Sequence, residues 1–203
     1  MTSVVIDLTM SLDGFVAGPN DGAQHPLGTH GGEQLFDWYQ GGDVMRGDKR
    51  FAPQGRDRDV VEMMFEAYGA FVTGRRTYDI TNGWDGTHPL VKNVIVVTHQ
   101  PPVDVPKGES TFEFVRSIDD AIVKAKKLVT TKAIVVGTAR IAQQALAAGL
   151  VDELFLHIAP IVLGRGLRLL DKLGTLPVVL QQAEGIVGPK ATHVRYRVVK
   201  TST

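Results

Sequence analysis

The sequence contains no cysteine, which excludes disulfide scaffolds, cysteine-ligated zinc sites and thiol catalysis. It also has no excess charge of either sign, because 22 lysines and arginines balance 22 aspartates and glutamates. Nucleic-acid binders usually carry a net basic surface, so this balance argues against that class. A neutral chain repels copies of itself only weakly, and we therefore expect self-association to be permitted.

Long hydrophobic runs are absent as well. The longest, such as Ala133–Val136 and Ile158–Leu163, have the length of strands and are too short to cross a bilayer. The amino terminus lacks the basic region and long apolar stretch of a secretory signal, and the histidines show no metal-ligand spacing. We expect a cytoplasmic protein that binds no membrane, nucleic acid or metal.

What is present is an alternation of strands and helices. Apolar runs rich in β-branched residues predict strands at Val4–Leu8, Ala70–Thr73, Val94–Thr98, Ala133–Val136 and Asp152–Leu163. Apolar residues at helical spacing predict helices at Glu33–Gln40, at Asp59–Tyr68, from Arg75 onward, after Ser117, and at Ala139–Ala148. Asp57 or Asp59 is expected to cap the second helix. The glycine-rich segment Gly41–Gly55 predicts an exposed loop or insertion.

The carboxyl-terminal part predicts a closing pair of antiparallel strands at Val178–Glu184 and Thr192–Val199. In the second of these, Val194, Tyr196 and Val198 alternate with polar residues, which is the period of a half-buried strand. Continuous apolar strands separated by helices imply a mostly parallel sheet covered on both faces. Because no repeat, linker or charge block divides the chain, we expect a single α/β domain over residues 1–203.

One strand-to-helix junction indicates phosphate binding. In the stretch Phe71–Tyr78 a strand ends at Gly74, and the helix that follows begins with Arg75 and Arg76. Paired guanidiniums bind phosphate bidentately. The helix dipole disfavours two cations at an amino-terminal end, so these arginines indicate an external anion. The alternative is a solvated first turn.

Two further junctions have a similar form. In Ile134-Val-Val-Gly-Thr-Ala-Arg-Ile141 an apolar strand runs into Gly137 and then a helix, a geometry suited to a pyrophosphate. A single glycine at such a turn also serves purely steric needs. The strand that ends in Thr98 presents a hydroxyl that can contact a ribose or phosphate. All three junctions lie at carboxyl ends of parallel strands, where open α/β sheets bind ligands.

These residues resemble a known superfamily. Gly74-Arg-Arg-Thr-Tyr78 resembles the G-R-x-T-[WY] turn of dihydrofolate reductases, and Val136-Gly-Thr-Ala-Arg140 resembles their later glycine-rich turn. Ser11-Leu-Asp-Gly14 and Leu150-Val-Asp-Glu-Leu154, followed by Ala159-Pro-Ile-Val-Leu-Gly164, look more like the reductase domain of bifunctional riboflavin biosynthesis enzymes. The likeness spans nearly the whole chain. It implies a dihydrofolate reductase-like, three-layer αβα fold with a mostly parallel central sheet and an antiparallel carboxyl-terminal hairpin.

The resemblance also implies NADPH as the hydride donor. By position, the 2′-phosphate would be held by Arg75, Arg76, Thr77 and Thr98, close to Gly74, and the pyrophosphate by Gly137, Thr138, Ala139, Arg140 and Ile141; Val16 and Ala17 would lie near the nicotinamide. Riboflavin-type reductases commonly pair as twofold dimers. We therefore expect a homodimer whose interface includes part of Asp152–Gly164 or Thr192–Val199.

Dihydrofolate reductases place an acid on the first helix to assist protonation of the pterin. Asp37 occupies the comparable helix here, and Glu33 is the alternative. A carboxylate in an apolar pocket has a raised pKa and can relay a proton. The other interpretation is an acid on the wet face of a short helix. Asp13 is a further candidate, with a competing role as a turn-forming residue before Gly14.

The resemblance implies an NADPH-dependent reductase of a pyrimidine- or pterin-like heterocycle. The closest activity is reduction of 5-amino-6-(5-phosphoribosylamino)uracil, a step of riboflavin biosynthesis. Dihydrofolate reduction is an alternative, weakened because no helix carries an arginine for the folate tail next to the acidic residue. A nucleotide-binding protein without catalysis is another.

Overall fold

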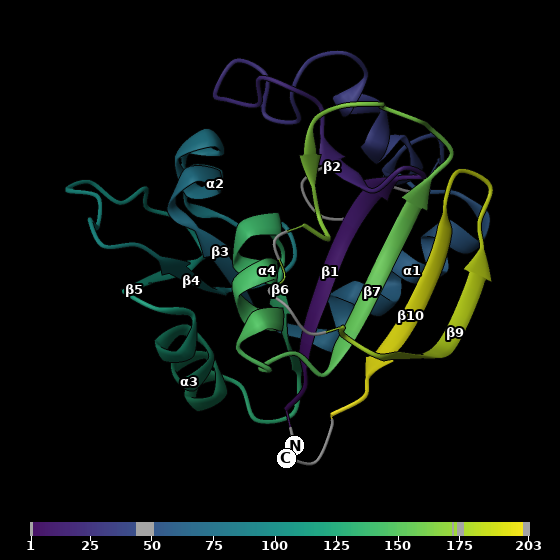
Figure 1. Ribbon diagram of the computed structural model, residues 1–203. Coiled ribbons are helices and arrows are strands. Elements are labelled where there is room, and N and C mark those ends of the chain that lie inside the picture. Colours follow the sequence, from purple (N-terminus) through teal and green to yellow (C-terminus); the bar gives the residue numbers. More distant parts are fainter. Residues whose placement is uncertain (1, 44–50, 172, 174–176, 201–203) are drawn as a thin grey trace.

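The computed structural model describes residues 2–43, 51–171, 173 and 177–200. The strands are β1 (Val4–Ser11), β2 (Phe15–Ala17), β3 (Tyr68–Gly74), β4 (Asn93–Val97), β5 (Thr111–Val115), β6 (Ala133–Val136), β7 (Glu153–Ala159), β8 (Leu167–Arg168), β9 (Leu180–Val187) and β10 (Thr192–Val198). Eight of them form one sheet in the order β5-β4-β3-β6-β1-β7-β10-β9, and β2 pairs with β8 (Figure 1).

Six neighbouring strands of this sheet, from β5 to β7, run parallel. The last two pairings, β7 with β10 and β10 with β9, are antiparallel. The predicted sheet, mostly parallel with an antiparallel carboxyl-terminal pair, is therefore confirmed. Because parallel strands share a direction, β1, β3, β4 and β6 all end at one edge of the sheet, where ligands bind in open α/β folds.

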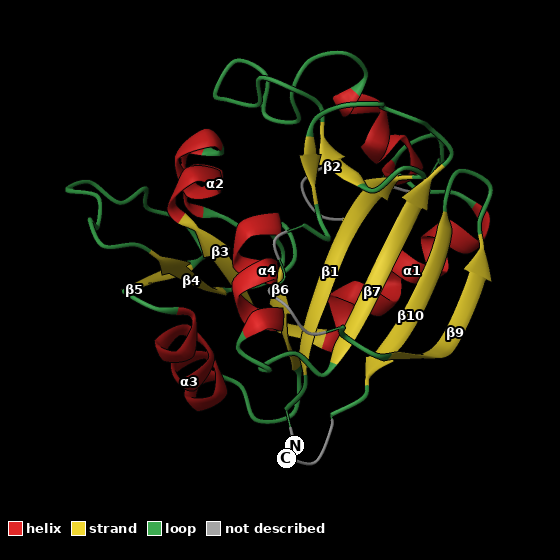
Figure 2. Ribbon diagram, in the orientation of Figure 1, coloured by secondary structure: helices red, strands yellow, loops and turns green. Residues whose placement is uncertain are grey.

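Helices cover both faces of the sheet and give three layers. They are η1 (Gly32–Tyr39) and η2 (Asn82–Gly86), both of the 3-10 type, and α1 (Gly55–Ala67), α2 (Arg75–Ile80), α3 (Ile118–Leu128) and α4 (Ala139–Ala147). Figure 2 shows α3 and α4 in front of the sheet and α1 behind it. Side chains of β1 point alternately to the two layers, so that Ile6 packs in the front core and Val5 in the rear one.

The segment Gly41–Gly55, predicted to be an exposed loop, is exposed only in part. Residues 44–50 lie outside the described residues. Phe51 and Ala52 are each only 4% exposed, and the Phe51 ring meets the rings of Tyr39 and Phe65 edge to face. The prediction was wrong for Phe51 and Ala52, because their burial depends on η1 and α1, which a local composition does not reveal.

Helix α1 begins at Gly55, four residues before the predicted start at Asp59. The expected cap is also wrong. Gln54 occupies the cap position without a side-chain hydrogen bond, and Asp57 lies inside the helix with its carboxylate fully buried against the sheet. Its Oδ1 lies 3.0 Å from His193 Nε2 on β10. The contact with His193, and not helix capping, therefore explains the position of Asp57.

The homodimer stays a prediction. The unpaired edge strand at this end of the sheet is β9, and not one of the two segments named for the interface from the sequence. Strands β7 and β10 are hydrogen-bonded on both sides, whereas β9 pairs only with β10 among the described residues. In Figure 2 no helix of the described residues covers the front face of these three strands. We propose that two copies associate through β9 and this face, since bare edges and uncovered apolar faces invite association.

Val187, which is 71% exposed on β9, gives the clean test of that dimer. Light scattering after gel filtration should give a dimer mass for the wild type and a smaller mass for Val187→Asp. Tyr196→Asp should weaken the dimer too, but it should also lower stability, because the Tyr196 ring packs against the core of its own subunit. A monomer mass for the wild type at micromolar concentration would refute the proposal.

Candidate functional site

Two adjoining cavities open at the carboxyl edge of the parallel strands. The first, of about 340 Å³, is called the aromatic cavity because Phe36, Tyr39, Tyr68, Phe71 and Trp84 are among its lining residues. The second, of about 660 Å³, is called the basic cleft; among the described residues it is lined by Arg75, Arg76, Arg116 and Arg140 and by one acid, Asp21. Five residues line both: Asp21, Thr77, Thr138, Ala139 and Leu167. An elongated ligand can therefore span the two.

The structure brings all the expected cofactor residues to these cavities. Val16, Ala17 and Gly137 line the aromatic cavity, and Gly74, Arg75, Arg76, Thr98, Arg140 and Ile141 line the basic cleft, with Thr77, Thr138 and Ala139 between them. They come from β2 and from the ends of three parallel strands. Their assignment to cofactor binding stays a prediction, but their convergence on one continuous space is a feature of the fold.

Thr138 lies where the two cavities meet, at the start of α4. Its Oγ1 is buried and is one of two such side-chain atoms without a hydrogen-bond partner among the described residues. The first N–H groups of a helix also lack intrahelical partners and favour an anion. An orphaned hydroxyl beside free amides fits the pyrophosphate of a dinucleotide.

Gly137 meets a steric need of the fold, and its contact with a cofactor stays a prediction. A Cβ placed on it would lie 2.0 Å from Cε2 of Phe71, so the ring of Phe71 occupies the space of a side chain. The steric alternative considered for this glycine therefore accounts for it. Gly74 is less constrained, because a Cβ there would meet Ile141 Cγ1 at 3.2 Å.

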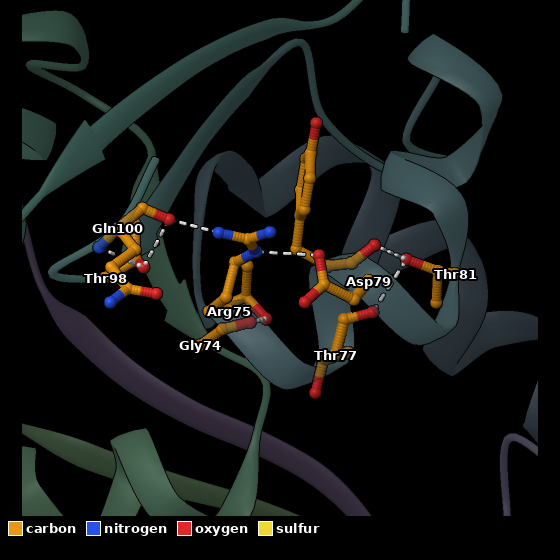
Figure 3. A network of polar contacts seen from close by, with 9 residues as sticks. Gly74, Arg75, Thr77, Asp79, Thr81, Thr98 and Gln100 are labelled. Atoms are coloured by element: carbon orange, nitrogen blue, oxygen red, sulfur yellow. Dashed lines mark hydrogen bonds and ion pairs between the residues drawn. The ribbon is translucent and has the colours of Figure 1, made fainter. Parts of the chain in front are cut away.

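The two arginines of α2 already have internal partners. Arg75 Nε donates to Asp79 Oδ1 at 2.7 Å, and its Nη1 donates to the carbonyl of Gln100 (Figure 3). Arg76 Nε donates to Asp21 Oδ2 at 3.0 Å, and this bond raises the pKa of the Arg76 guanidinium. The inference that these cations need an external anion was wrong, since Asp79 and Asp21 offset the unfavourable dipole. A phosphate in the cleft would share the arginines with these carboxylates.

None of the three acids proposed for proton transfer lines the aromatic cavity. Asp37 and Glu33 are exposed on η1, and neither lines the cavity. Asp13 binds Ser11 Oγ at 2.6 Å and Gly164 N at 2.7 Å, and the Ser11 bond is the main reason its pKa is lowered. The wet-face interpretation thus describes Asp37, whose catalytic role stays a prediction, and Asp13 ties two loops together.

Among the described residues two acids line this cavity. Asp21 is paired with Arg76, and Asp7 interrupts the apolar run of β1. Asp7 is 8% exposed, and its Oδ2 accepts a hydrogen bond from the Tyr68 hydroxyl. Its Oδ1 lies 3.1 Å from His157 Nε2. Burial raises the pKa of Tyr68 well above its usual value, and the Asp7 charge raises it further, so the phenol keeps its proton.

Behind Asp7 the polar contacts continue through two histidines. His157 Nδ1 lies 2.7 Å from His193 Nδ1, and His193 Nε2 lies 3.0 Å from Asp57 Oδ1. Both histidines and Asp57 are fully buried. Burial lowers the pKa of His193, the His157 charge lowers it further, and the bond to Asp57 opposes the shift.

This lowered pKa predicts how stability depends on pH. Because the folded pKa lies below the unfolded value of about 6.5, the unfolded chain takes up the proton first as the pH falls. The free energy of unfolding should be greatest above about pH 6.5 and decrease below it. Denaturant unfolding across this range measures the slope. His193→Gln should reduce the slope and the exposed control His99→Gln should not, so equal slopes would contradict the prediction.

Aromatic side chains line the same cavity as Asp7. The rings of Phe71 and His88 are 4.4 Å apart, and Trp84 lies 5.6 Å from Phe71. Trp84 has a positive φ of 51°, a left-handed backbone that costs roughly 1–2 kcal/mol at a non-glycine residue. Strain of this kind gathers at ligand sites. A cavity lined by aromatic rings and a buried acid suits a planar heterocycle that takes up a proton.

Among the described residues, no group of three or more histidines, aspartates and glutamates is arranged to hold a metal ion. None of the helices that the structure describes combines the length and apolar character needed to span a bilayer.

Two solved structures define the fold class. Dihydrofolate reductase from Enterococcus faecalis, solved with NADP(H), aligns over 98% of this chain and 97% of its own, with a TM-score of 0.59 and 12% identity. A putative riboflavin biosynthesis protein from Shewanella sp. PV-4 aligns over 98% of this chain and 100% of its own, with a TM-score of 0.72 and 19% identity. The fold is dihydrofolate reductase-like.

The family follows from the sequence. The profile of the RibD C-terminal domain matches residues 2–187, and the chain belongs to this family. RibD of Acinetobacter baumannii aligns over 98% of this chain with a TM-score of 0.63 and 14% identity, and this chain covers 59% of that protein. No curated protein matches the sequence significantly.

Proposed function

We propose that this protein is an NADPH-dependent reductase of a pyrimidine- or pterin-like heterocycle. Its closest named activity is reduction of 5-amino-6-(5-phosphoribosylamino)uracil. One observation carries the proposal: a basic cleft and an aromatic cavity meet at Thr77, Thr138 and Ala139. A cofactor bound across this junction would present one end to a planar substrate. Membership of the RibD C-terminal domain family supports the assignment.

The chain's own residues fit NADPH in a definite way. Arg75 and Arg76 would bind the 2′-phosphate, since a guanidinium keeps unused donors after one carboxylate contact. Thr138 Oγ1 and the first amides of α4 would bind the pyrophosphate. Val16 and Ala17 would flank the nicotinamide from β2. NADPH, when bound, supplies the hydride.

The remaining chemistry belongs to the aromatic cavity. Phe71 and Trp84 would stack on the heterocycle and exclude water from the site of reduction. Asp7 would donate the proton that accompanies the hydride, because it is the buried acid of this cavity. Tyr68, which keeps its proton, would hold Asp7 Oδ2 in place.

Steady-state oxidation of NADPH tests the proposal. Turnover should be found with 5-amino-6-(5-phosphoribosylamino)uracil or another pyrimidine, and not with dihydrofolate. Turnover with dihydrofolate instead would favour the alternative that the protein is a dihydrofolate reductase. Tight binding of NADPH without oxidation by either substrate would favour a nucleotide-binding protein that has lost catalysis.

A further inference from the structure

A chain of four buried ionisable groups leads from the aromatic cavity into the layer behind the sheet. It starts at Asp7 on β1, passes through His157 on β7 and His193 on β10, and ends at Asp57 on α1. The three contacts between successive groups are 3.1, 2.7 and 3.0 Å. Asp7, at the cavity, is 8% exposed, and the other three are not exposed at all. We name these residues the Asp–His–His–Asp chain.

The number of protons in this chain follows from its hydrogen bonds. Each of the three contacts joins two atoms that can accept, so each needs one proton to become a hydrogen bond. Three protons shared by two carboxyls and two imidazoles leave a single negative charge. A second buried charge would add a large desolvation cost, so the chain holds at least three protons.

The neighbouring titratable groups leave this charge on the carboxyls. Burial raises the pKa of Tyr39 and of Tyr68 well above the usual value, so both stay neutral. Arg195 of β10, which faces the same layer, is paired with Glu153 at 3.0 Å. The two imidazoles lie between the carboxyls, and burial lowers the pKa of His193, which favours its neutral form.

Both ends and the middle of the chain are held in place. The Lys190 backbone N–H donates to Asp57 Oδ2 at 3.1 Å. Position 188 must be glycine, because a Cβ there would lie 1.6 Å from Asp57 Oδ1. In the middle, the indole of Trp38 lies against both imidazoles, with ring centroids 4.7 and 4.9 Å away. The distances therefore stay within the range over which a proton can move between heavy atoms.

We propose that Asp57 is a proton store for Asp7, connected to it by His157 and His193; the catalytic use of this store rests on the proposed function. Before the reaction Asp7 carries a fourth proton, and the four groups together are neutral. Once Asp7 has given this proton to the substrate, the three protons counted above remain, and Asp57 passes its proton to His193 Nε2. The proton on His193 Nδ1 moves to His157 Nδ1. The proton on His157 Nε2 then moves to Asp7 Oδ1.

This transfer balances. Each hydrogen bond still holds one proton at the end, both imidazoles have exchanged tautomer, and the negative charge has moved from Asp7 to Asp57. The cavity acid is thus reset without a charged imidazole as the final state and without water entering the aromatic cavity. A purely structural network would need the same hydrogen bonds but no movement of the protons.

The first test uses the protein without cofactor or substrate. The carboxyl resonances of ¹³C-labelled aspartates are followed against pH in the wild type and in Asp7→Asn. If a proton is shared, Asp7→Asn should displace the titration midpoint of Asp57 by about one pH unit or more. Asp104→Asn, the same change at an exposed residue, is the control and should leave Asp57 unchanged. An Asp57 titration unaffected by Asp7→Asn overturns the proposal.

The second test uses turnover. Asp57→Asn keeps an acceptor for the Lys190 N–H and a donor for His193, but an amide does not release a proton. We expect kcat to fall about tenfold or more, with KM, NADPH affinity and melting temperature nearly unchanged. Unchanged kcat overturns the role of Asp57 as a store. Coupled titrations in a protein that reduces no heterocycle would instead count against the proposed function alone.

Discussion

Replacing Asp7 with asparagine is expected to lower kcat about a hundredfold or more, because the buried acid of the aromatic cavity would no longer supply a proton. NADPH affinity should stay nearly unchanged, since Asp7 lines only the aromatic cavity and not the basic cleft. Nicotinamide fluorescence measures the affinity, and single-turnover oxidation of NADPH separates the chemical step from product release.

Asp37→Asn is the matched control for this prediction. Its carboxylate is exposed on η1, so the same substitution there should change kcat little. The opposite ranking, with a hundredfold loss in Asp37→Asn and normal turnover in Asp7→Asn, would restore the assignment that the resemblance to dihydrofolate reductases implied. It would also remove the catalytic use of the Asp–His–His–Asp chain.

The second large effect concerns cofactor choice. The double variant Arg75→Gln, Arg76→Gln should bind NADPH about a hundredfold more weakly, while its affinity for NADH should change little. A hydrogen bond to a charged group contributes roughly 1.5–3 kcal/mol, and two contacts at the lower end of that range give about this factor. We take the lower end because Asp79 and Asp21 already engage the two arginines.

The control for this experiment is Arg56→Gln, which removes an exposed guanidinium on α1, outside both cavities. Fluorescence titration with both cofactors compares the three proteins. Equal affinity of the wild type for NADPH and NADH would refute the role of the arginines in recognising the 2′-phosphate. An equal loss for both cofactors in the double variant would show that the arginines support the cleft rather than read the phosphate.

Most of the sheet could be predicted from the sequence because its central strands have a recognisable pattern. β3, β4 and β6 are covered on both faces and are therefore continuous apolar runs. β5 was not predicted, because its two phenylalanines alternate with Thr111 and Glu113 and this edge strand contains no long apolar run. β2 and β8 are shorter still, and their pairing joins segments separated by a large part of the chain. No local pattern contains that pairing.

Site residues that lie within one short stretch of sequence could be predicted. Site residues that the fold brings together from distant parts of the sequence could not. The glycine-containing turns after β3 and β6 lie within single short stretches, and all the expected cofactor residues reach the two cavities. Asp7 was visible as a polar residue in an apolar strand. Its partner His157 is 150 positions away, and Asp57 is 136 positions from His193, so no spacing rule connects them. The same holds for Arg76 and Asp21, 55 positions apart.

The indole of Trp38 against the two imidazoles gives the molecule an optical reporter of its own interior. The sequence has two tryptophans, and they lie in different surroundings: Trp38 is 1% exposed and touches both histidines, whereas Trp84 lines the aromatic cavity. A soluble quencher such as iodide would reach Trp84 in preference to Trp38. The emission that remains in the presence of the quencher would come from Trp38 and report the protonation of the histidines. The emission that the quencher removes would come from Trp84 and report occupancy of the cavity. Steady-state fluorescence of the unlabelled protein can thus separate the two events.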